Sequence, residues 1–378
     1  MDINKIHLVL FLSRATSLER WNQLGILDRE IKYYRELSNH LGGLSLVTCG
    51  GQEDLQYRSQ LGNMELLYNK WGLPANIYSI LSVFLHWPVL KTADVFKTNQ
   101  LDGSWSAVLA GMLHHKPVIV RAGYLWSQFF QLGEGKGIKS RIIQALQTIT
   151  LKRSTAIFVT TETMGRELKQ DFPFLANKIY IVPNYVDLEL FTPDKYRFSK
   201  PGRICFVGRL NPQKNLTHLL LALSEIPDCS LIVVGDGVQR VELEKLAHKH
   251  GVDAQFSGVV PHSELPGIIK SCRIFILPSL YEGHPKALIE AMACGVPVIG
   301  TNVPGIKELI LHGQTGILCS PEIESIREAL KDLLANQDIQ EQLGENASRY
   351  VTEYFSLPKV LEMEIEGIAA TFDPYEQS

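Results

Sequence analysis

The sequence predicts an α/β protein with two Rossmann-like, doubly wound domains that face a central cleft. Its 378 residues exceed what one compact core usually holds. Short apolar runs alternate with longer amphipathic stretches, which is the pattern of parallel strands covered by helices on both faces. This alternation stops after residue 184 and restarts near residue 202, so we expect two sheets rather than one.

The first series of strands and helices fills the N-terminal half. Residues 24–40 and 137–154 have helical periodicity. The apolar stretch 77–90 falls short of the roughly 20 residues that span a bilayer, so we expect a buried helix or an interfacial segment. The N-terminal run holds His7 and ends at Arg14 without a small-residue cleavage site, which favours a buried strand over a signal peptide. The expected strands are 5–12, 44–50, 93–98, 116–123, 155–161 and 179–184.

The second series begins after an irregular linker at 185–202. We therefore expect an N-terminal domain at 1–190 and a C-terminal domain at 200–354. Ligands of doubly wound sheets bind at the carboxyl ends of the strands, so motifs that directly follow a strand carry the most weight. The expected strands of the second domain are 202–209, 230–237, 254–260, 273–279 and 296–301.

The composition is that of an ordered globular protein. Apolar residues make up 45% and charged residues 20%, and the net charge of −3 gives no sign of nucleic-acid binding. The cysteines form no CxxC pair, and most of them lie in apolar runs. We expect packed, reduced thiols in a cytoplasmic protein rather than disulfides or a zinc site. They are Cys49, Cys205, Cys229, Cys272, Cys294 and Cys319.

The stretch FVGRLNPQKN at 206–215 is a strand followed by a loop with two cations. Gly208 allows close backbone approach, and Arg209 and Lys214 can converge on one anion if the loop folds back before a helix. A phosphate or diphosphate is the natural ligand. A solvated loop with two ordinary cations is an equally good interpretation of this stretch alone.

The stretch LIVVGDGVQ at 231–239 predicts a tight turn between a strand and a helix. It matches only part of the GxGxxG fingerprint and lacks a suitable third glycine, so it is weak evidence for a dinucleotide. We interpret Gly235 as part of a second glycine-rich wall of the same pocket.

The stretch YEGHPKALIEAMACGVPVIGT at 281–301 contains two glutamates eight positions apart. Gly283 and Pro285 interrupt a helix, so Glu282 is expected in a loop and Glu290 near the first turns of the next helix. Free N–H groups at that helix start attract anions, and carboxylates accept hydrogen bonds from hydroxyls. This combination suits a nucleotide sugar, although a capping residue and a surface charge are the plainer interpretations.

At this point the chain resembles the family-four retaining glycosyltransferases, which have the GT-B fold and an E-x7-E motif. The resemblance runs from 155 to 320 through FVGRL, VVGDG, SGVVPHSEL and VPNYVDLELFTP. It implies that Arg209 and Lys214 bind the diphosphate, and that Glu290 binds the ribose. It also implies that a helix at about 355–378 returns to the N-terminal domain. The implied donor-binding residues are Gly208, Arg209, Lys214, Gly235, Val260, Glu282, Gly283, His284, Pro285, Lys286, Ala287 and Glu290, with Arg209, Lys214 and Glu282 as the catalytic set.

The N-terminal half departs from the family pattern. The usual glycine pair after the first strand is absent, and Arg14, Ser13 or Ser17 is expected to supply the contacts in its place. Ala122 stands where many members have a histidine, which leaves Arg121 and Tyr124 as nearby polar side chains. The resemblance implies a front-face reaction in which the departing phosphate takes the acceptor proton, so no metal and no other cofactor are expected.

The acceptor is expected to be a glycan or a lipid-linked molecule, in surface polysaccharide or glycoconjugate synthesis. Residues 135–154 hold five cations and no acidic residue, and aromatic side chains lie just before them. Such a segment suits the inner face of an anionic membrane, but a solvated basic face explains it almost as well.

Other functions remain open. A nucleotide-sugar 2-epimerase also uses two Rossmann domains, and isomerisation without an acceptor would identify it. A non-catalytic nucleotide-sugar-binding protein would bind the donor without turnover. An NAD oxidoreductase is disfavoured because the dinucleotide fingerprint is incomplete.

Overall fold

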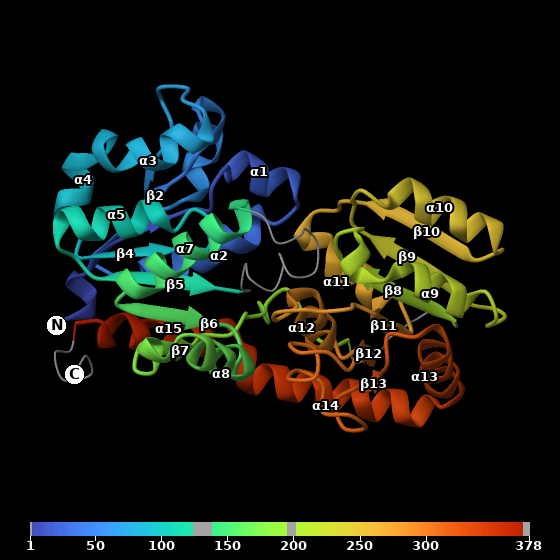
Figure 1. Ribbon diagram of the computed structural model, residues 1–378. Coiled ribbons are helices and arrows are strands. Elements are labelled where there is room, and N and C mark those ends of the chain that lie inside the picture. The colour runs from blue at the N-terminus through green and yellow to red at the C-terminus, as the bar shows by residue number, and fades with distance from the viewer. Residues whose placement is uncertain (1, 124–137, 195–201, 373–378) are drawn as a thin grey trace. The chain divides into compact units, whose positions relative to one another are not determined.

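The computed structural model describes residues 2–123, 138–194 and 202–372 (Figure 1). The chain forms two compact units. The first unit holds residues 1–182 together with 361–378, and the second holds 183–360. Each unit is built on one parallel sheet, as the sequence predicted.

The first unit contains a seven-stranded sheet in the order β3-β2-β1-β4-β5-β6-β7. Every pair of neighbouring strands is parallel. The strands are β1 (His7–Phe11), β2 (Gly43–Val47), β3 (Glu65–Leu67), β4 (Val95–Thr98), β5 (Val118–Ala122), β6 (Ala156–Val159) and β7 (Ile179–Ile181).

Helices cover this sheet between successive strands. The α-helices are α1 (Leu18–Gln23), α2 (Leu27–Ser38), α3 (Ala75–Leu85), α4 (Trp87–Thr92), α5 (Trp105–His114), α7 (Ile138–Arg153), α8 (Glu162–Asp171) and, from its fifth residue onward, α15 (Leu357–Ala370). Short 3₁₀ helices lie at Ile3–Lys5, Gln52–Gln60 and Pro173–Leu175.

The second unit contains a six-stranded parallel sheet in the order β10-β9-β8-β11-β12-β13. This is the doubly wound order 3-2-1-4-5-6. Its strands are β8 (Arg203–Val207), β9 (Ser230–Val234), β10 (Asp253–Gly258), β11 (Ile274–Leu277), β12 (Val298–Thr301) and β13 (Ile317–Cys319). Its α-helices are α9 (Leu216–Leu223), α10 (Arg240–Lys249), α11 (Leu265–Lys270), α12 (Lys286–Ala293), α13 (Ile323–Ala335) and α14 (Gln337–Phe355), with 3₁₀ helices at Pro212–Lys214 and His262–Glu264.

Burial explains why the apolar runs became strands. The central strands β1, β4 and β11 are buried almost throughout, so both of their faces pack against helices. Every strand expected from the sequence is present within a few residues of its predicted bounds. The six cysteines are free thiols, as expected. None of the helices in the described part of the chain combines the length and hydropathy needed to cross a membrane.

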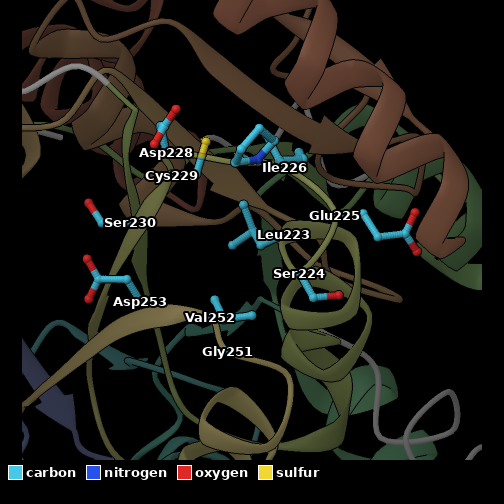
Figure 2. Close-up of a pocket in the computed structure, with 11 residues that line it drawn as sticks. Leu223, Ser224, Glu225, Ile226, Asp228, Cys229, Ser230, Gly251, Val252 and Asp253 are labelled. Atoms are coloured by element: carbon cyan, nitrogen blue, oxygen red, sulfur yellow. The ribbon is translucent and has the colours of Figure 1, made fainter.

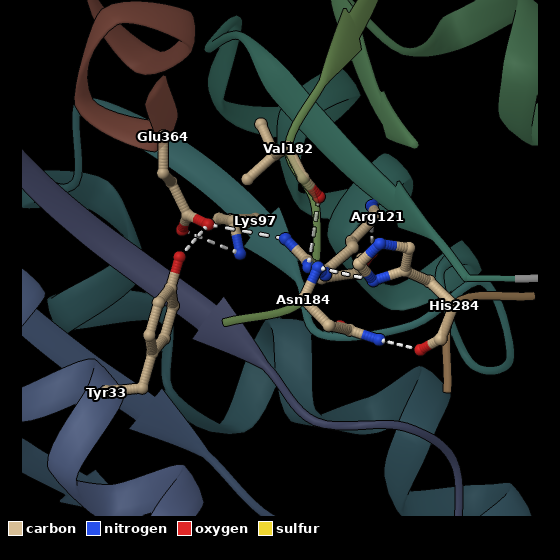
Figure 3. Close-up of polar contacts among 8 residues, drawn as sticks. Tyr33, Lys97, Arg121, Val182, Asn184, His284 and Glu364 are labelled. Atoms are coloured by element: carbon tan, nitrogen blue, oxygen red, sulfur yellow. Dashed lines mark hydrogen bonds and ion pairs between the residues drawn. The ribbon is translucent and has the colours of Figure 1, made fainter. Parts of the chain in front are cut away.

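A buried group of charges holds helix α15 in the first unit (Figure 3). The carboxylate of Glu364 lies 3.1 Å from Lys97 Nζ and 3.4 Å from an Arg121 nitrogen. Tyr33 donates its hydroxyl hydrogen to the same carboxylate at 2.5 Å. The side chains of Lys97 and Glu364 are both fully buried. Burial alone would raise the pKa of Glu364, but Lys97, Arg121 and Tyr33 hold it below its ordinary value.

We expect Glu364→Gln to lower the free energy of unfolding by about 3–5 kcal/mol, because the change leaves buried cations without their counter-charge. Urea unfolding of both proteins measures this loss. Glu366→Gln, on an exposed position of the same helix, is the matched control and should change little. Because the pKa of Glu364 is lowered on folding, its contribution is present above the ordinary carboxyl range and is lost as the pH falls. Equal stability of the two variants would contradict this assignment.

Candidate functional site

The sequence motifs gather at the switch point of the second sheet. Strands β8 and β11 are neighbours, and the chain leaves them toward opposite edges of the sheet. A crevice opens at the carboxyl ends of two such strands, and ligands of doubly wound folds bind there. The cationic loop follows β8 directly at Gly208, and the loop that holds Glu282 follows β11.

An ion pair joins these two loops. Lys214 Nζ contacts Glu282 Oε1, and Ser279 donates its hydroxyl hydrogen to the same oxygen at 2.7 Å. Both charged side chains are largely buried, at 14% exposed for Lys214 and 8% for Glu282. Sequence reasoning placed the two residues in one site, but it did not predict their pairing. A ligand could replace either residue as the partner of the other.

The main chain fixes the same two loops to each other. Gln213 donates its side-chain amide hydrogen to the carbonyl of Tyr281 at 2.8 Å. The N–H of Leu280 in turn donates to the carbonyl of Gln213 at 2.8 Å. These two hydrogen bonds of Gln213 hold the residue next to Lys214 against the loop that carries Glu282.

The glycines allow the loops after β8 and β9 to touch. Gly235 has φ +126°, and a Cβ on it would lie 2.0 Å from the carbonyl oxygen of Gly208. Its N–H donates to the carbonyl of Gly258 at 2.8 Å, so the turn after β9 also contacts the end of β10. Only glycine fits at this position, which explains the GDG turn without any dinucleotide.

Glu290 lies on α12 and is only 2% exposed. With the proton on Nε2, His262 donates a hydrogen bond of 2.8 Å to Glu290 Oε1. The imidazole is itself buried and packs against the ring of Phe191, with 5.1 Å between centroids. The prediction that Glu282 lies in a loop and Glu290 on the following helix is confirmed. The carboxylate of Glu290 is held in place by His262 rather than open to solvent.

The start of α12 is supported from the segment that opens the second unit. Asn184 donates its backbone N–H to His284 Nδ1 at 3.1 Å and its side-chain amide hydrogen to the carbonyl of His284 at 2.6 Å. His284 is therefore a packed residue, and its ring also lies against Phe355. No side chain caps the helix at Pro285, and Lys286 Nζ lies over the ring of Tyr185.

Other predicted donor-site residues line the surface around this pair. Arg209 is exposed, and its side chain makes no hydrogen bond or ion pair with the described residues. Val260, Gly283 and Ala287 are each partly exposed.

The predicted N-terminal residues have structural partners of their own. Arg14 follows β1 and contacts Asp102 at 3.5 Å and Asn76 at 3.0 Å. The guanidinium of Arg121 points into the buried charge group, where it also donates to the carbonyl of Val182 at 3.3 Å. Tyr124 lies outside the described residues.

A separate hollow of about 740 Å³ lies in the second unit (Figure 2). It is lined by the end of α9, by the loop from there to Cys229, by residues 251–252 after α10, and by Ser230 and Asp253, which begin β9 and β10. These are the amino ends of the strands, opposite the edge where the motifs gather. This hollow is therefore not part of the candidate site. The described residues hold no cluster of three or more His, Cys, Asp or Glu side chains that could bind a metal ion.

Comparison with known proteins identifies the family of this chain. Residues 191–350 match the family described as Glycosyl transferases group 1, and residues 33–190 match the one described as Glycosyltransferase Family 4. An uncharacterized glycosyltransferase of Haemophilus influenzae is 32% identical over 287 residues, which are 74% of this chain and 79% of that protein. The chain belongs to this glycosyltransferase family. The resemblance inferred from the E-x7-E region is thus confirmed.

A second relative of this family member matches over a shorter length. A glycogen synthase of Mycobacterium tuberculosis is 28% identical over 229 residues. That match covers 58% of this chain but only 55% of the synthase, so the chain spans little more than half of that relative.

Solved structures confirm the GT-B fold of this family member. A sucrose-phosphate synthase from Thermosynechococcus elongatus superimposes with a TM-score of 0.81 at 19% identity, covering 97% of this chain and 99% of that one. The Anabaena protein HepE, solved in complex with UDP and glucose, gives 0.78 at 17% identity, with 96% and 99% covered.

Sequence reasoning missed several residues of the candidate site in this glycosyltransferase. His262 was part of the quoted stretch SGVVPHSEL, yet nothing local to that stretch reveals a partner 28 positions away on α12. Ser279 and Gln213 were not singled out: Ser279 ends the expected strand 273–279, and Gln213 lies in the stretch 206–215 without an assigned role. The signal that could have found His262 is a buried carboxylate in the apolar run ALIEAMA, because such a group needs a donor.

We expect His262→Ala to lower the free energy of unfolding by about 1–3 kcal/mol, because it leaves the Glu290 carboxylate buried without this donor. Thermal and urea unfolding measure the loss. His262→Gln keeps a donor and should recover part of it, and His248→Ala on an exposed position of α10 serves as the control. If the His262→Ala protein is as stable as its parent, the hydrogen bond does not contribute to the free energy of unfolding.

Proposed function

We propose that the protein is a retaining hexosyltransferase that moves a sugar from a nucleotide-sugar donor to an acceptor. The observation that carries this proposal is the pair Lys214–Glu282, which lies at the switch point of the second sheet and next to the start of α12. A cation beside a helix N-terminus suits a diphosphate, and a carboxylate beside it suits a sugar hydroxyl.

In this proposal the bound donor exchanges partners with the ion pair. The diphosphate takes the ammonium of Lys214 and the exposed guanidinium of Arg209. Glu282 then becomes free to accept a hydrogen bond from a sugar hydroxyl, while Ser279 continues to orient its carboxylate. Because Lys214 and Glu282 pair with each other, neither is a lone buried charge before the donor binds.

The nucleoside occupies the neighbouring part of the same surface. Glu290, oriented by His262, accepts a hydrogen bond from the ribose hydroxyls. The main chain around Val260 holds the base, and the backbone from Gly283 to Ala287 contacts sugar and phosphate. The side chain of His284 is already bonded to Asn184, so only its backbone is assigned to the donor.

Catalysis depends on stabilising the negative charge that develops on the leaving group. Breaking the glycosidic bond leaves negative charge on the diphosphate, which Arg209 and Lys214 stabilise more strongly in the transition state than in the ground state. The acceptor attacks from the face that the diphosphate leaves and gives its proton to a phosphate oxygen, so the configuration at the anomeric carbon is retained. This scheme assigns no step to Ala122, and it uses these two cations where other enzymes use a metal.

The relatives support a uridine nucleotide as the donor. HepE was solved with UDP and glucose and also with UDP-glucose. The acceptor is proposed to be a glycan or a lipid-linked molecule at the cytoplasmic face of a membrane. A 2-epimerase or a binding protein would use the same donor site, so turnover with an acceptor separates those alternatives from the transferase.

We expect a UDP-sugar, and UDP itself, to raise the melting temperature of the protein, while GDP and ADP compounds do not. A panel of donors, each tested beside its free nucleoside diphosphate, measures this, because a ligand that binds only the folded state stabilises it in proportion to the logarithm of its concentration. The absence of any shift at millimolar concentrations would contradict the donor site.

We expect Lys214→Ala to abolish the shift caused by UDP and to lower kcat/KM by about a hundredfold or more, because it removes a charge-assisted contact to the diphosphate. Lys245→Ala, on an exposed position of α10, is the matched control and should behave like the parent protein. Isothermal titration and a coupled assay for released UDP give the two readouts. Unchanged UDP affinity in Lys214→Ala would overturn the assignment of the diphosphate.

A further inference from the structure

Helix α3 in the first unit carries a stripe of large apolar side chains on its exposed side. Its outward side presents Ile77, Ile80 and Phe84, which are 48%, 51% and 51% exposed. These positions are spaced three and four residues apart, so they form one stripe along the helix. A surface helix normally turns such a stripe toward the core.

The inward side of α3 carries apolar and polar side chains together. Tyr78 and Val83 pack in the core, and Ser79 and Ser82 are buried beside them. The indole N–H of Trp105 donates to Ser79 Oγ at 3.2 Å, and Ser106 donates to the carbonyl of Ser79 at 2.5 Å. Because these hydrogen bonds fix the orientation of the helix, the apolar stripe cannot rotate inward without leaving buried hydroxyls unpaired.

Helix α7 also exposes apolar side chains. Leu146 and Ile149 are 41% and 54% exposed, while Leu151, Gln147 and Thr150 on the same helix are buried. Trp87 on α4 and Met112 on α5 are also exposed, at 40% and 48%.

These residues belong to one surface. Helices α3, α4 and α7 each contact α5 (Figure 1). The connections β3 to β4, β4 to β5 and β5 to β6 all step in the same direction across a parallel sheet. Right-handed crossovers in one direction lie on the same face of the sheet. We call this surface the apolar face; it comprises Ile77, Ile80, Phe84, Trp87, Met112 and Ile149.

The charges on these helices have one sign. Residues 75–93, 103–116 and 144–154 contain no aspartate or glutamate. They contribute Lys91, Lys152 and Arg153, and also Lys116, which lies 4.0 Å from Asp94 just beyond the first range. Apolar side chains, an interfacial tryptophan and an excess of cations are the chemistry that suits an anionic lipid surface.

We propose that the apolar face docks the first unit onto an anionic lipid bilayer. The isoleucines and Phe84 enter the boundary between headgroups and acyl chains, and Trp87 lies at headgroup depth. The lysines and arginine meet the negative headgroups. The stretch 77–90 was expected to be a buried helix or an interfacial segment, and its outward side has the composition of the latter.

Docking itself does not depend on the reaction. Its use, which is to bring a lipid-linked acceptor to the enzyme, rests on the proposed function. The two can fail separately, because the apolar face lies in the first unit and the donor site in the second.

The test is cosedimentation of the full chain with vesicles. We compare phosphatidylcholine vesicles with vesicles that also contain phosphatidylglycerol. The parent protein should bind the anionic vesicles, and added salt should weaken that binding. Ile80→Ser combined with Phe84→Ser should weaken it about tenfold or more, because two large apolar side chains no longer enter the lipid.

The control variant combines Val238→Ser with Val241→Ser, which removes exposed apolar side chains at 90% and 62% exposure from the second unit. It should bind vesicles like the parent. Thermal shifts with UDP-sugars, recorded on all proteins, show whether the variants are folded and whether the donor site is intact. Equal vesicle binding by both variants would overturn the proposal. It would also be overturned if the parent protein does not bind vesicles and instead forms dimers through this face, as measured by sedimentation equilibrium.

Discussion

The first unit depends on a single buried carboxylate. Glu364 arrives on the last long helix and meets Lys97 from β4 and Arg121 from β5, two cations that the sheet cannot neutralise by itself. Arg121 also binds the carbonyl of Val182, where the chain leaves this unit. The guanidinium of Arg121 therefore holds both the segment at Val182, where the chain leaves the first unit, and helix α15, with which the chain returns to it. In the second unit Val186 does the equivalent through backbone hydrogen bonds to Phe355 and Leu357.

Much of the fold was predictable because the strands in the middle of each sheet are buried on both faces and appear as unbroken apolar runs. The edge strands β3 and β13 were missed, and each has only three residues and is partly exposed. The edge strand β7 is equally short, but it was found because its apolar run continues to Val182. For helix α3 the apolar composition left a buried helix and an interfacial segment open, because composition does not show which side of a helix packs on the core. Tyr78 and Val83 are buried, whereas Ile80 and Phe84 are exposed.

The candidate site was predictable where local chemistry determines the position of a residue. Glycines that allow close backbone contact, and a proline that starts a helix, located Gly235, Glu282 and Glu290 on the correct elements. Pairing between distant loops was not predictable. The contact from Lys214 to Glu282 spans 68 positions, and Arg121, expected at the site, pairs with a residue 243 positions away. Such partners are set by the sheet topology, which no local pattern contains.

The long sequence separation of the Glu364 contacts has a consequence for synthesis. Tyr33 and Arg121 cannot form these contacts until Glu364 has been synthesised, and it follows them by 331 and 243 positions. Domains generally fold as units while the chain emerges from the ribosome, and the N-terminal one usually completes first. Here the second unit can assemble from its own residues as soon as they emerge. The first unit, although translated earlier, must hold Lys97 and Arg121 without their counter-charge until almost the whole chain has been made. The half that begins the protein is therefore the last to be finished.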